Sequence, residues 1–326
     1  MDLNNKEKIR NEGIVHFWNL PNKIYVILHS DFKNRLMKDF MIIARTKYNA
    51  KKITEIQRET ISNIINKSNP TIRIKYLLKI IKIINKEEFN LHNVEIHIKW
   101  IGDFKSKGII NPKLPFNFNS RAGARFVAAI CNEGWISDGM YYSNSKEESR
   151  QSVKSDAIEI FGESYESIGN FVKEKDQYLA FPSIMRDAIN ILTDFKGVKA
   201  ENNPNIPPFI LKNKELLYGW LEQTIGDEGH VKFYLDSYRR EIIWRRACDT
   251  KFDKCNLIES ELKILQNLGI KYDLKNIGRY TTSKGKNRFR MQIRISRKEN
   301  LKRLTNSIRI PNNIKDEKLI EMLKSC

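Results

Sequence analysis

The chain has 326 residues, 40% of them hydrophobic, which is enough for two domains or for a duplicated domain with an extension. Its net charge of +19 is spread along the whole length, so the composition favours a polyanionic partner such as nucleic acid, with a general lysine bias as the alternative. No apolar run reaches about 18 residues and no apolar segment lies near the N-terminus, which predicts no membrane span, no secretory signal and a cytoplasmic, nucleoid-associated protein.

Cysteine and histidine spacing gives no metal motif. The four cysteines form no CxxC pair and the five histidines form no HExxH motif, so the sequence predicts no structural zinc. Cys131 lies in an apolar segment and is predicted to be a reduced core residue.

The first 98 residues are predicted to form a small all-α domain. Residues 1–12 are polar and are predicted to be loose. The apolar spacing of residues 31–48 is typical of a helix, with Asp31 as its N-cap. Three further helices are predicted at 51–57, 59–68 and 71–85.

Two short helices with a tight connection, set between longer helices, are typical of a helix-turn-helix motif. The arrangement is similar to the small domain of phage-repressor-type regulators, and residues 59–66 would then enter the major groove of DNA. The alternative is a four-helix supporting domain with solvated polar faces. The polar candidates for base contacts are Thr60, Ser62, Asn63 and Asn66.

Glycine and proline are concentrated in residues 99–118, which are predicted to form a linker. Two regions follow, 119–209 and 210–326, each opening with an apolar helix at 120–132 or 214–226. The first region continues with a strand near 135–144, a helix at 146–162, a strand at 175–181 and a helix at 184–195. The second continues with strands within 230–247, a helix at 257–269, a strand pair within 272–296 and a helix at 299–308. This mixture predicts an α+β fold with mostly antiparallel sheets.

Both apolar helices end in the same short pattern. FVAAICNEGWI at 126–136 and LEQTIGDEGHV at 221–231 each contain an apolar run, an acid, a glycine, one further residue and isoleucine or valine. The matching acids are Glu133 and Glu228. A carboxylate at the end of an apolar helix is costly without a partner, and two such helices packed together would place both carboxylates side by side. Paired carboxylates bind divalent metal ions.

This pattern resembles the LAGLIDADG family of homing endonucleases, in its single-chain form with two repeats, over roughly residues 100–326. Glu133 and Glu228, each followed by glycine, stand at the final aspartate of the family motif, and Ala128 stands at its internal glycine. Two positions depart from the motif, which has an acid and a small residue there, namely Cys131 and Gln223.

The resemblance implies two pseudo-symmetric αββαββα repeats whose antiparallel sheets form a DNA-binding saddle. It also implies a monomer, without an obligate protein partner, that binds double-stranded DNA and cuts both strands at a long site. Glu133 and Glu228 would bind Mg²⁺ or Mn²⁺ and support hydrolysis of the phosphodiester bonds.

Basic residues are expected beside the acids. The segment 194–210 resembles the family's join between repeats, and Lys199 matches the basic residue that stabilises the transition state or polarises water there. In the second repeat the candidates are Lys284 and Lys286, with the choice between them left open. Asp227 is predicted to be an accessory acid or a capping residue.

Charged and apolar residues alternate in NRFRMQIRIS at 287–296, as in a strand with one buried face. Arg288, Arg290, Gln292 and Arg294 share the other face, where the strand has no glutamate to balance them. A DNA backbone would balance them, and arginine and glutamine also read base edges; the alternative is an ordinary solvated face. Further arginines predicted to contact DNA are Arg239, Arg240, Arg245, Arg246 and Arg279.

Other functions fit the same fold. A non-cleaving DNA-binding regulator is one, although such descendants of the family typically lose the motif acids. An intron-RNA maturase is another, with RNA as the partner of the same basic sheets. An intein is disfavoured, because the chain runs from Met1 to Cys326 without a splicing-type His-Asn terminus.

Overall fold

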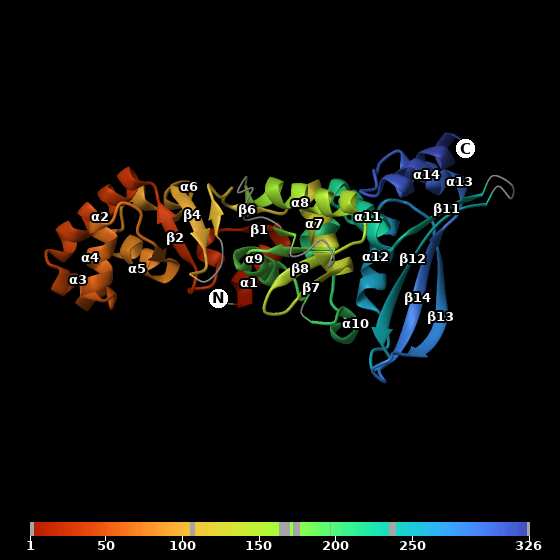
Figure 1. Ribbon diagram of the computed structural model, residues 1–326, viewed down its shortest axis with the longest axis horizontal. Helices are drawn as coiled ribbons and strands as arrows, with labels where there is room; N and C mark the ends of the chain where they lie inside the picture. The colour runs from red at the N-terminus through yellow and green to blue at the C-terminus, as the bar shows by residue number, and fades with distance from the viewer. Residues whose placement is uncertain are drawn as a thin grey trace.

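The computed structural model is elongated, with the N-terminal helices at one end and the C-terminal sheet at the other (Figure 1). The fold is mixed α+β with antiparallel sheets, as predicted. Within the described ranges, no helix combines the length and the apolar composition needed to cross a membrane. The residues described are 3–104, 108–162, 170–171, 177–195, 197–234 and 239–324.

The N-terminal region contains a sheet, where the sequence predicted helices only. β2 (Tyr25–Leu28) lies between β3 (Ile72–Arg73) and β4 (Ile98–Gly102), and β5 (Ile109–Ile110) pairs with β4. The all-α prediction is therefore wrong for this region. These short apolar runs lie far apart in the chain, and part of the sheet comes from residues 99–118, which read as a linker by composition.

The helices of this region follow the predicted order. α3 (Lys47–Thr54) and α4 (Arg58–Asn66) are joined by the short connection that a helix-turn-helix requires. Phe32, Leu36 and Phe40 are buried at four-residue spacing, which explains why their segment forms a helix with one apolar face. The other helical elements are α2 (Ser30–Ala44), α5 (Ile74–Ile84), α6 (Leu91–Ile96), η1 (Phe17–Asn19) and η2 (Glu87–Phe89).

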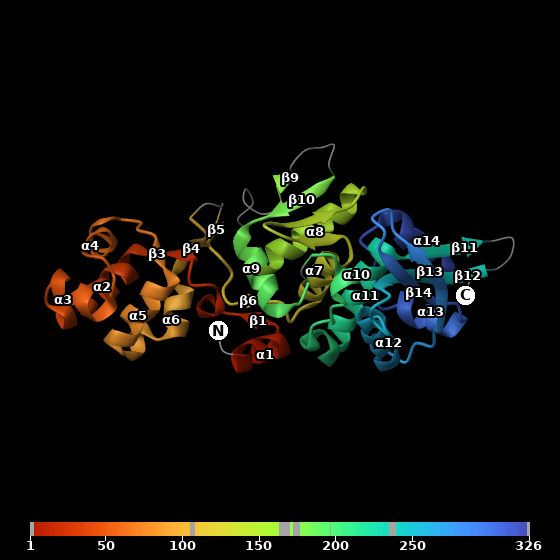
Figure 2. The ribbon, with the colours of Figure 1, turned by 90° about the horizontal axis from the view of Figure 1, so that it is seen from below.

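The first residues of the chain belong to the centre of the molecule. They form α1 (Leu3–Glu12), although the sequence predicted a loose segment. The Arg10 guanidinium donates a hydrogen bond to the carbonyl oxygen of Ile191 at 3.2 Å, and β1 (Ile14–Val15) pairs with β6 (Phe116–Asn117). α1 therefore lies beside the central body (Figure 2), and this tertiary contact orders a mostly polar helix whose Ile9 is buried.

The central body contains a four-stranded antiparallel sheet with strand order β7-β8-β10-β9. Its predicted helices and the strand predicted at 175–181 are present with small shifts at their ends. The strand predicted near 135–144 is instead divided into two paired strands, and a further short strand, β9, adds to the sheet. The elements are α7 (Arg121–Asn132), β7 (Gly134–Ile136), β8 (Met140–Ser143), α8 (Glu147–Phe161), β9 (Asn170–Phe171), β10 (Tyr178–Phe181) and α9 (Ser183–Leu192).

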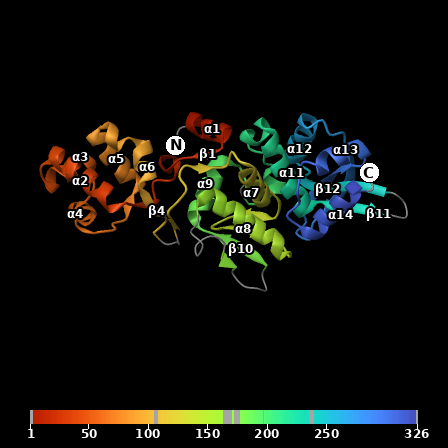
Figure 3. The same ribbon diagram turned by 90° about the horizontal axis from the view of Figure 1, so that it is seen from above.

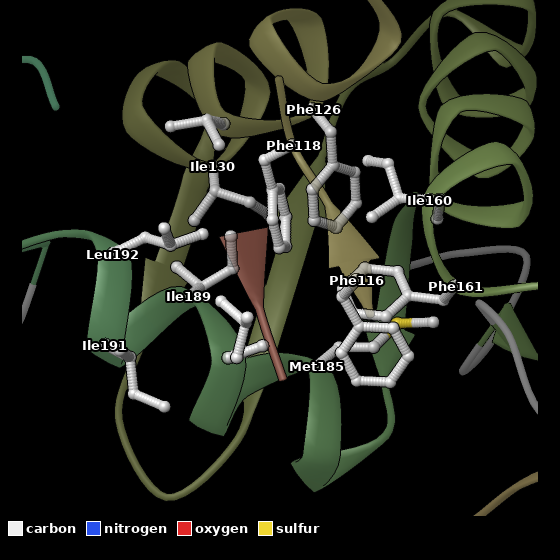
Figure 4. Close-up of a cluster of buried hydrophobic side chains, with 14 of the residues drawn as sticks. Phe116, Phe118, Phe126, Ile130, Ile160, Phe161, Met185, Ile189, Ile191 and Leu192 are labelled. Atoms are coloured by element: carbon white, nitrogen blue, oxygen red, sulfur yellow. The ribbon is translucent and has the colours of Figure 1, made fainter. Parts of the chain in front are cut away.

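The core of this body combines phenylalanine rings with isoleucine, leucine and methionine side chains (Figure 4). The ring of Phe161 packs edge-on against Phe116 and Phe126, with ring centroids 4.7 and 5.9 Å apart. Phe118 and Met185 complete the cluster, and all five side chains are buried. This core joins α7, α8 and α9 and so fixes the position at which α7 ends.

The C-terminal body has the strand order β11-β12-β14-β13, which is the order of the central sheet. A final helix, α14, was not predicted. The elements are α10 (Lys199–Asn202), η3 (Pro208–Lys212), α11 (Lys214–Glu228), β11 (His230–Tyr234), β12 (Arg239–Asp249), α12 (Asn256–Asn267), β13 (Asp273–Thr281), β14 (Asn287–Ile295), α13 (Lys298–Thr305) and α14 (Asn313–Lys324).

Helices α7 and α11 pack against each other at the junction of the two bodies (Figure 3). Gly219 permits this approach, because a Cβ there would lie 2.6 Å from the carbonyl oxygen of Arg121 and 3.1 Å from the Cβ of Ala124. Buried Glu222 crosses the same junction, where Arg121 lies 2.6 Å and Arg125 3.3 Å from its carboxylate oxygens. The helix pair is thus held by close backbone contact and by a paired buried charge.

Candidate functional site

The two packed helices end side by side, and each ends at one acid of the repeated pattern. Glu133 directly follows α7, and Glu228 is the last residue of α11. A Cβ on Gly134 or Gly229 would lie within 2.6 Å of a main-chain atom of the isoleucine four positions earlier. The glycine after each acid is therefore required by the turn that leads directly into the next strand.

Glu133 offers a carboxylate without a local partner. Among the described residues, no hydrogen bond or ion pair reaches its side-chain oxygens. Partial burial raises the pKa of Glu133 to about 7, and the negative charges of Glu228 and Asp227 add to this effect. A cation beside Glu133 would stabilise its charged form against both burial and the neighbouring negative charges.

Asp227, unlike Glu133, has several hydrogen-bond partners. It accepts hydrogen bonds from the Tyr142 hydroxyl at 2.6 Å, from Gln223 Nε2 at 3.0 Å and from Asn132 Nδ2 at 3.2 Å. Burial raises its pKa to about 6, although these donors favour the charged form. Its oxygens are already satisfied, so Asp227 positions neighbouring side chains and is a poor candidate for a metal ligand.

Arg246 connects Glu228 to the interior. Its Nη1 lies 3.2 Å from Glu228 Oε1, and its Nη2 donates to Glu261 Oε1 at 2.6 Å and to Asn132 Oδ1 at 2.7 Å. Burial disfavours its charge, but Glu261 and Glu228 together hold the pKa of Arg246 above its usual range. The sequence predicted Arg246 to contact DNA, and the structure corrects this, because the side chain is buried in an ion-pair network.

Two lysines approach the acids, and only one was predicted. Lys199 Nζ donates to the carbonyl oxygen of Gly134, and burial lowers its pKa. Lys315 Nζ donates to the carbonyl oxygens of Gly226 at 2.6 Å and Ile225 at 3.2 Å, and burial lowers its pKa despite the nearby acids. Sequence reasoning missed Lys315 because nothing in the pattern placed α14 against the end of α11.

Lys284 and Lys286 take another position. Both lie in the turn between β13 and β14, and Lys286 forms an ion pair with Glu201 of α10 at 2.6 Å. Lys199, by contrast, is among the positive charges that lower the pKa of Glu133. The prediction that one of them stands beside the acids is therefore not supported by their contacts.

Strand pairing decides which arginines share a face. Arg245 lies opposite Gln292 and donates to its Oε1 at 3.1 Å, so it joins the alternating side chains of β14. The resulting surface, called the arginine face below, consists of Arg245, Arg288, Arg290, Gln292 and Arg294.

Other predicted DNA contacts lie elsewhere. Arg279 pairs with Phe289 and Arg240 with Phe233, which places both arginines on the side of the sheet opposite the arginine face. Neither arginine therefore shares a face with the predicted contacts of β14, because a strand sends successive side chains to opposite faces. The side chain of Arg239 lies outside the described residues.

The arginine face also carries acids, contrary to the prediction from β14 alone. Arg294 lies 3.5 Å from carboxylate oxygens of both Glu241 and Asp273. Arg288 lies 3.1 Å from Glu201. The balancing carboxylates come from neighbouring strands and from α10, which the alternation of one strand could not reveal. Positive charge remains concentrated at Arg245 and Arg290.

A pocket of about 330 Å³ lies between Glu228 and the arginine face. Its lining includes Lys199, Glu228, His230, Arg245 and Arg290. Burial lowers the pKa of His230, and the charges of Lys315 and Arg245 add to this effect. A phosphate group in this pocket would meet basic side chains on its way to the carboxylates.

The predicted recognition helix is a separate candidate. Asn63 and Asn66 are exposed on α4, while Thr60 and Ser62 are half-buried. Ser62 Oγ accepts a hydrogen bond from Lys47 Nζ at 3.1 Å and one from Asn66 Nδ2 at 3.2 Å. The two asparagines are thus the more available of the four predicted base contacts.

Known proteins were compared with the chain in two ways. A scan against models of protein families found no match. A search of curated proteins also found no match to this chain.

Proposed function

We propose that this protein is a site-specific, divalent-metal-dependent DNA endonuclease of the LAGLIDADG type. The observation that carries the proposal is the meeting of Glu133 and Glu228 at the adjacent ends of α7 and α11. The equal strand orders of the two sheets support a pseudo-symmetric pair of αββαββα repeats forming a saddle on DNA. One chain would then supply both halves of the site.

The carboxylates suit a hard divalent cation such as Mg²⁺ or Mn²⁺. Glu133 lacks a hydrogen-bond partner among the described residues and has a raised pKa, and one oxygen of Glu228 is free of Arg246. These are the oxygen ligands that such ions prefer. A bound ion would supply activation of water and neutralisation of charge at phosphorus.

The remaining residues of the site bind and orient. Lys199 and Lys315, both of lowered pKa, would attract the phosphate and stabilise negative charge that develops on it. Asp227 and Arg246 would hold Asn132 and Glu228 in fixed orientations. Two acids, one from each repeat, would serve the two DNA strands.

The arginine face would grip the DNA major groove beside the site. Arg245 and Arg290 line the pocket that leads to Glu228, so binding and chemistry share one surface. α4 would add a separate contact through Asn63 and Asn66.

The test is cleavage of a randomised supercoiled plasmid library in Mg²⁺ or Mn²⁺. Double-strand cuts at one long sequence are expected from the parent protein. Glu133→Gln and Glu228→Gln should each abolish cutting while keeping DNA affinity, because the amide preserves shape but removes the charge that holds the ion. Glu321→Gln, an exposed position on α14, is the matched control and should cut normally.

Sequence-specific retention of DNA without cleavage in either ion would contradict the endonuclease and leave a DNA-binding regulator. Cleavage that persists in both glutamine variants would contradict the assignment of the two acids.

A second candidate, binding of unpaired RNA as in a maturase, is favoured by one observation on the central sheet. Trp135 and Tyr141 stack with centroids 4.7 Å apart, and Tyr178 meets both rings edge-on. Trp135 is 39% exposed. Exposed aromatic rings on a sheet stack with splayed bases of single strands. Retention of single-stranded RNA at the same affinity as duplex DNA would support this function.

A further inference from the structure

A second group of metal-binding side chains lies in the N-terminal region, away from the acids of α7 and α11. His92 and Glu95 lie three residues apart on α6 and share one helix face. His16, just before η1, reaches the same place from a segment 76 positions earlier (92 − 16). Figure 1 shows α6 within the N-terminal helices, separated from the α7 and α11 pair by the central strands.

The three side chains converge on one point. His16 Nδ1 lies 2.8 Å from Glu95 Oε2, and one ligand atom from each of the three residues falls within 4.8 Å of the others. Ligand atoms of a tetrahedral zinc ion are about 3.3 Å apart, given metal–ligand bonds of about 2.0–2.1 Å. Small side-chain rotations are enough to bring the group to that spacing.

Surrounding contacts orient the donors. The other carboxylate oxygen of Glu95 accepts a hydrogen bond from the backbone NH of Phe17 at 2.9 Å, and Glu95 is only 3% exposed. The ring of His16 stacks on Trp18 with centroids 4.1 Å apart, and His92 meets Trp18 edge-on. Such supporting contacts typically fix the orientation of metal ligands. His92 is exposed, so an ion can enter from solvent.

We infer that His16, His92 and Glu95 bind a divalent transition-metal ion of the zinc class. Two imidazoles and a carboxylate match zinc and its neighbours, whereas Mg²⁺ prefers oxygen ligands throughout. The ion takes the place of the proton between His16 Nδ1 and Glu95 Oε2, and the neutral imidazole then carries its single proton on Nε2. It joins the segment before η1 to α6 and leaves one coordination position for water. The inference is independent of the proposed endonuclease.

The sequence predicted no zinc because the histidines are scattered, and no spacing rule joins His16 to α6. Only the folding of the region brings the three donors together.

The test is Co²⁺ and Zn²⁺ binding by the full chain carrying Glu133→Gln and Glu228→Gln, which removes the other ion site. Calorimetry should show one equivalent, and Co²⁺ should give visible bands typical of a tetrahedral nitrogen–oxygen site. His92→Ala should weaken binding at least about tenfold, by analogy with the losses seen when metal-site contacts are removed. His29→Ala, another exposed histidine, is the matched control and should bind like the parent.

Equal affinity in the His92→Ala variant and the parent would overturn the inference, as would the absence of stoichiometric binding. His16→Gln provides a second variant, with circular dichroism to verify its fold. A folded His16→Gln protein that still binds one ion with parental affinity would also overturn it. Cleavage activity of the unmodified protein plays no part in these outcomes.

Discussion

The sheets of the central and C-terminal bodies have the same strand order but different outer surfaces. The strands β7, β8 and β10 carry no charged residue, and Trp135, Tyr141 and Tyr178 gather on their outer side. The C-terminal sheet instead presents the arginine face. Strand order depends on the buried side chains, whereas the outer side chains are free to differ.

The two bodies also differ at the acids. Glu228 has Arg246 as a direct partner, while the Glu133 carboxylate has no ion-pair partner among the described residues. Helices α7 and α11 therefore supply two chemically unequal carboxylates. A substitution in one body is therefore expected to have a different effect from the matching substitution in the other body.

The largest expected effect is a difference in stability between substitutions at two neighbouring arginines of β12. Arg246→Met should lower the free energy of unfolding by about 3–5 kcal/mol, because it leaves the buried Glu261 without its cationic partner. Arg245→Met, on the opposite face, should change stability by no more than about 0.5 kcal/mol. Urea denaturation followed by circular dichroism measures both. Equal losses in the two variants would contradict the assignment of faces.

The central sheet is tested by its aromatic residues. Trp135→Ala should weaken binding of single-stranded RNA by about 1–3 kcal/mol, the typical contribution of one stacked base. Tyr48→Ala removes an exposed aromatic ring from α3 and should have no effect. Fluorescence anisotropy with labelled RNA gives both affinities. Unchanged binding by Trp135→Ala would remove the argument for a stacking surface.

The arginine face is tested by the salt dependence of duplex DNA binding. Arg290→Ala should lower affinity by about 1 kcal/mol and reduce the slope of log affinity against log salt by about 1, as expected for one lost phosphate contact. Arg279→Ala, on the other side of the same sheet, should leave the slope unchanged. A reduced slope in the Arg279 variant alone would show that DNA approaches from the opposite side.

The smallest expected effect concerns pH. A folded-state pKa of about 7 for Glu133, above its usual 4.5, means that unfolded chains lose this proton first as pH rises. The contribution of Glu133 to the free energy of unfolding is therefore greatest below about pH 4.5. It falls as pH rises and levels off above about pH 7. Because the Glu133 side chain is still partly open to solvent, which screens its charge, the expected loss of stability is about 1 kcal/mol or less, below what the full pKa shift corresponds to.

Glu133→Gln should flatten this part of the profile of unfolding free energy against pH, and Glu321→Gln should not. Metal affinity of the parent should rise between about pH 6 and pH 8, since the ion competes with the proton on Glu133. A profile for Glu133→Gln that matches the parent would contradict the raised pKa.

Much of the fold could be predicted because its helices carry their apolar residues at local, periodic positions. The two acid–glycine pairs were also visible, since the turn that they form needs glycine within a few residues of the helix end. Prediction was poorer where the partner lies far away in the chain. The sheet of the N-terminal region and the helix α1 are the clearest cases.

The candidate site shows the same division. Glu133 and Glu228 were proposed from the repeated pattern and Lys199 from the family resemblance, but Lys315 was missed because α14 has no repeated motif. Alternation within β14 identified four side chains of one face correctly. It could not assign Arg240, Arg246 or Arg279, because their faces depend on the register between strands.

By itself, the sequence determined most of the longer helices, the matching sequence positions of the two acids and the alternation of β14, because each depends on residues within a few turns of one another. The tertiary structure alone decided which side chains from distant segments contact one another. It buried Arg246 against Glu261, placed acids beside Arg294 and brought His16 to α6. Those outcomes depend on packing and register between distant segments, which local spacing does not encode.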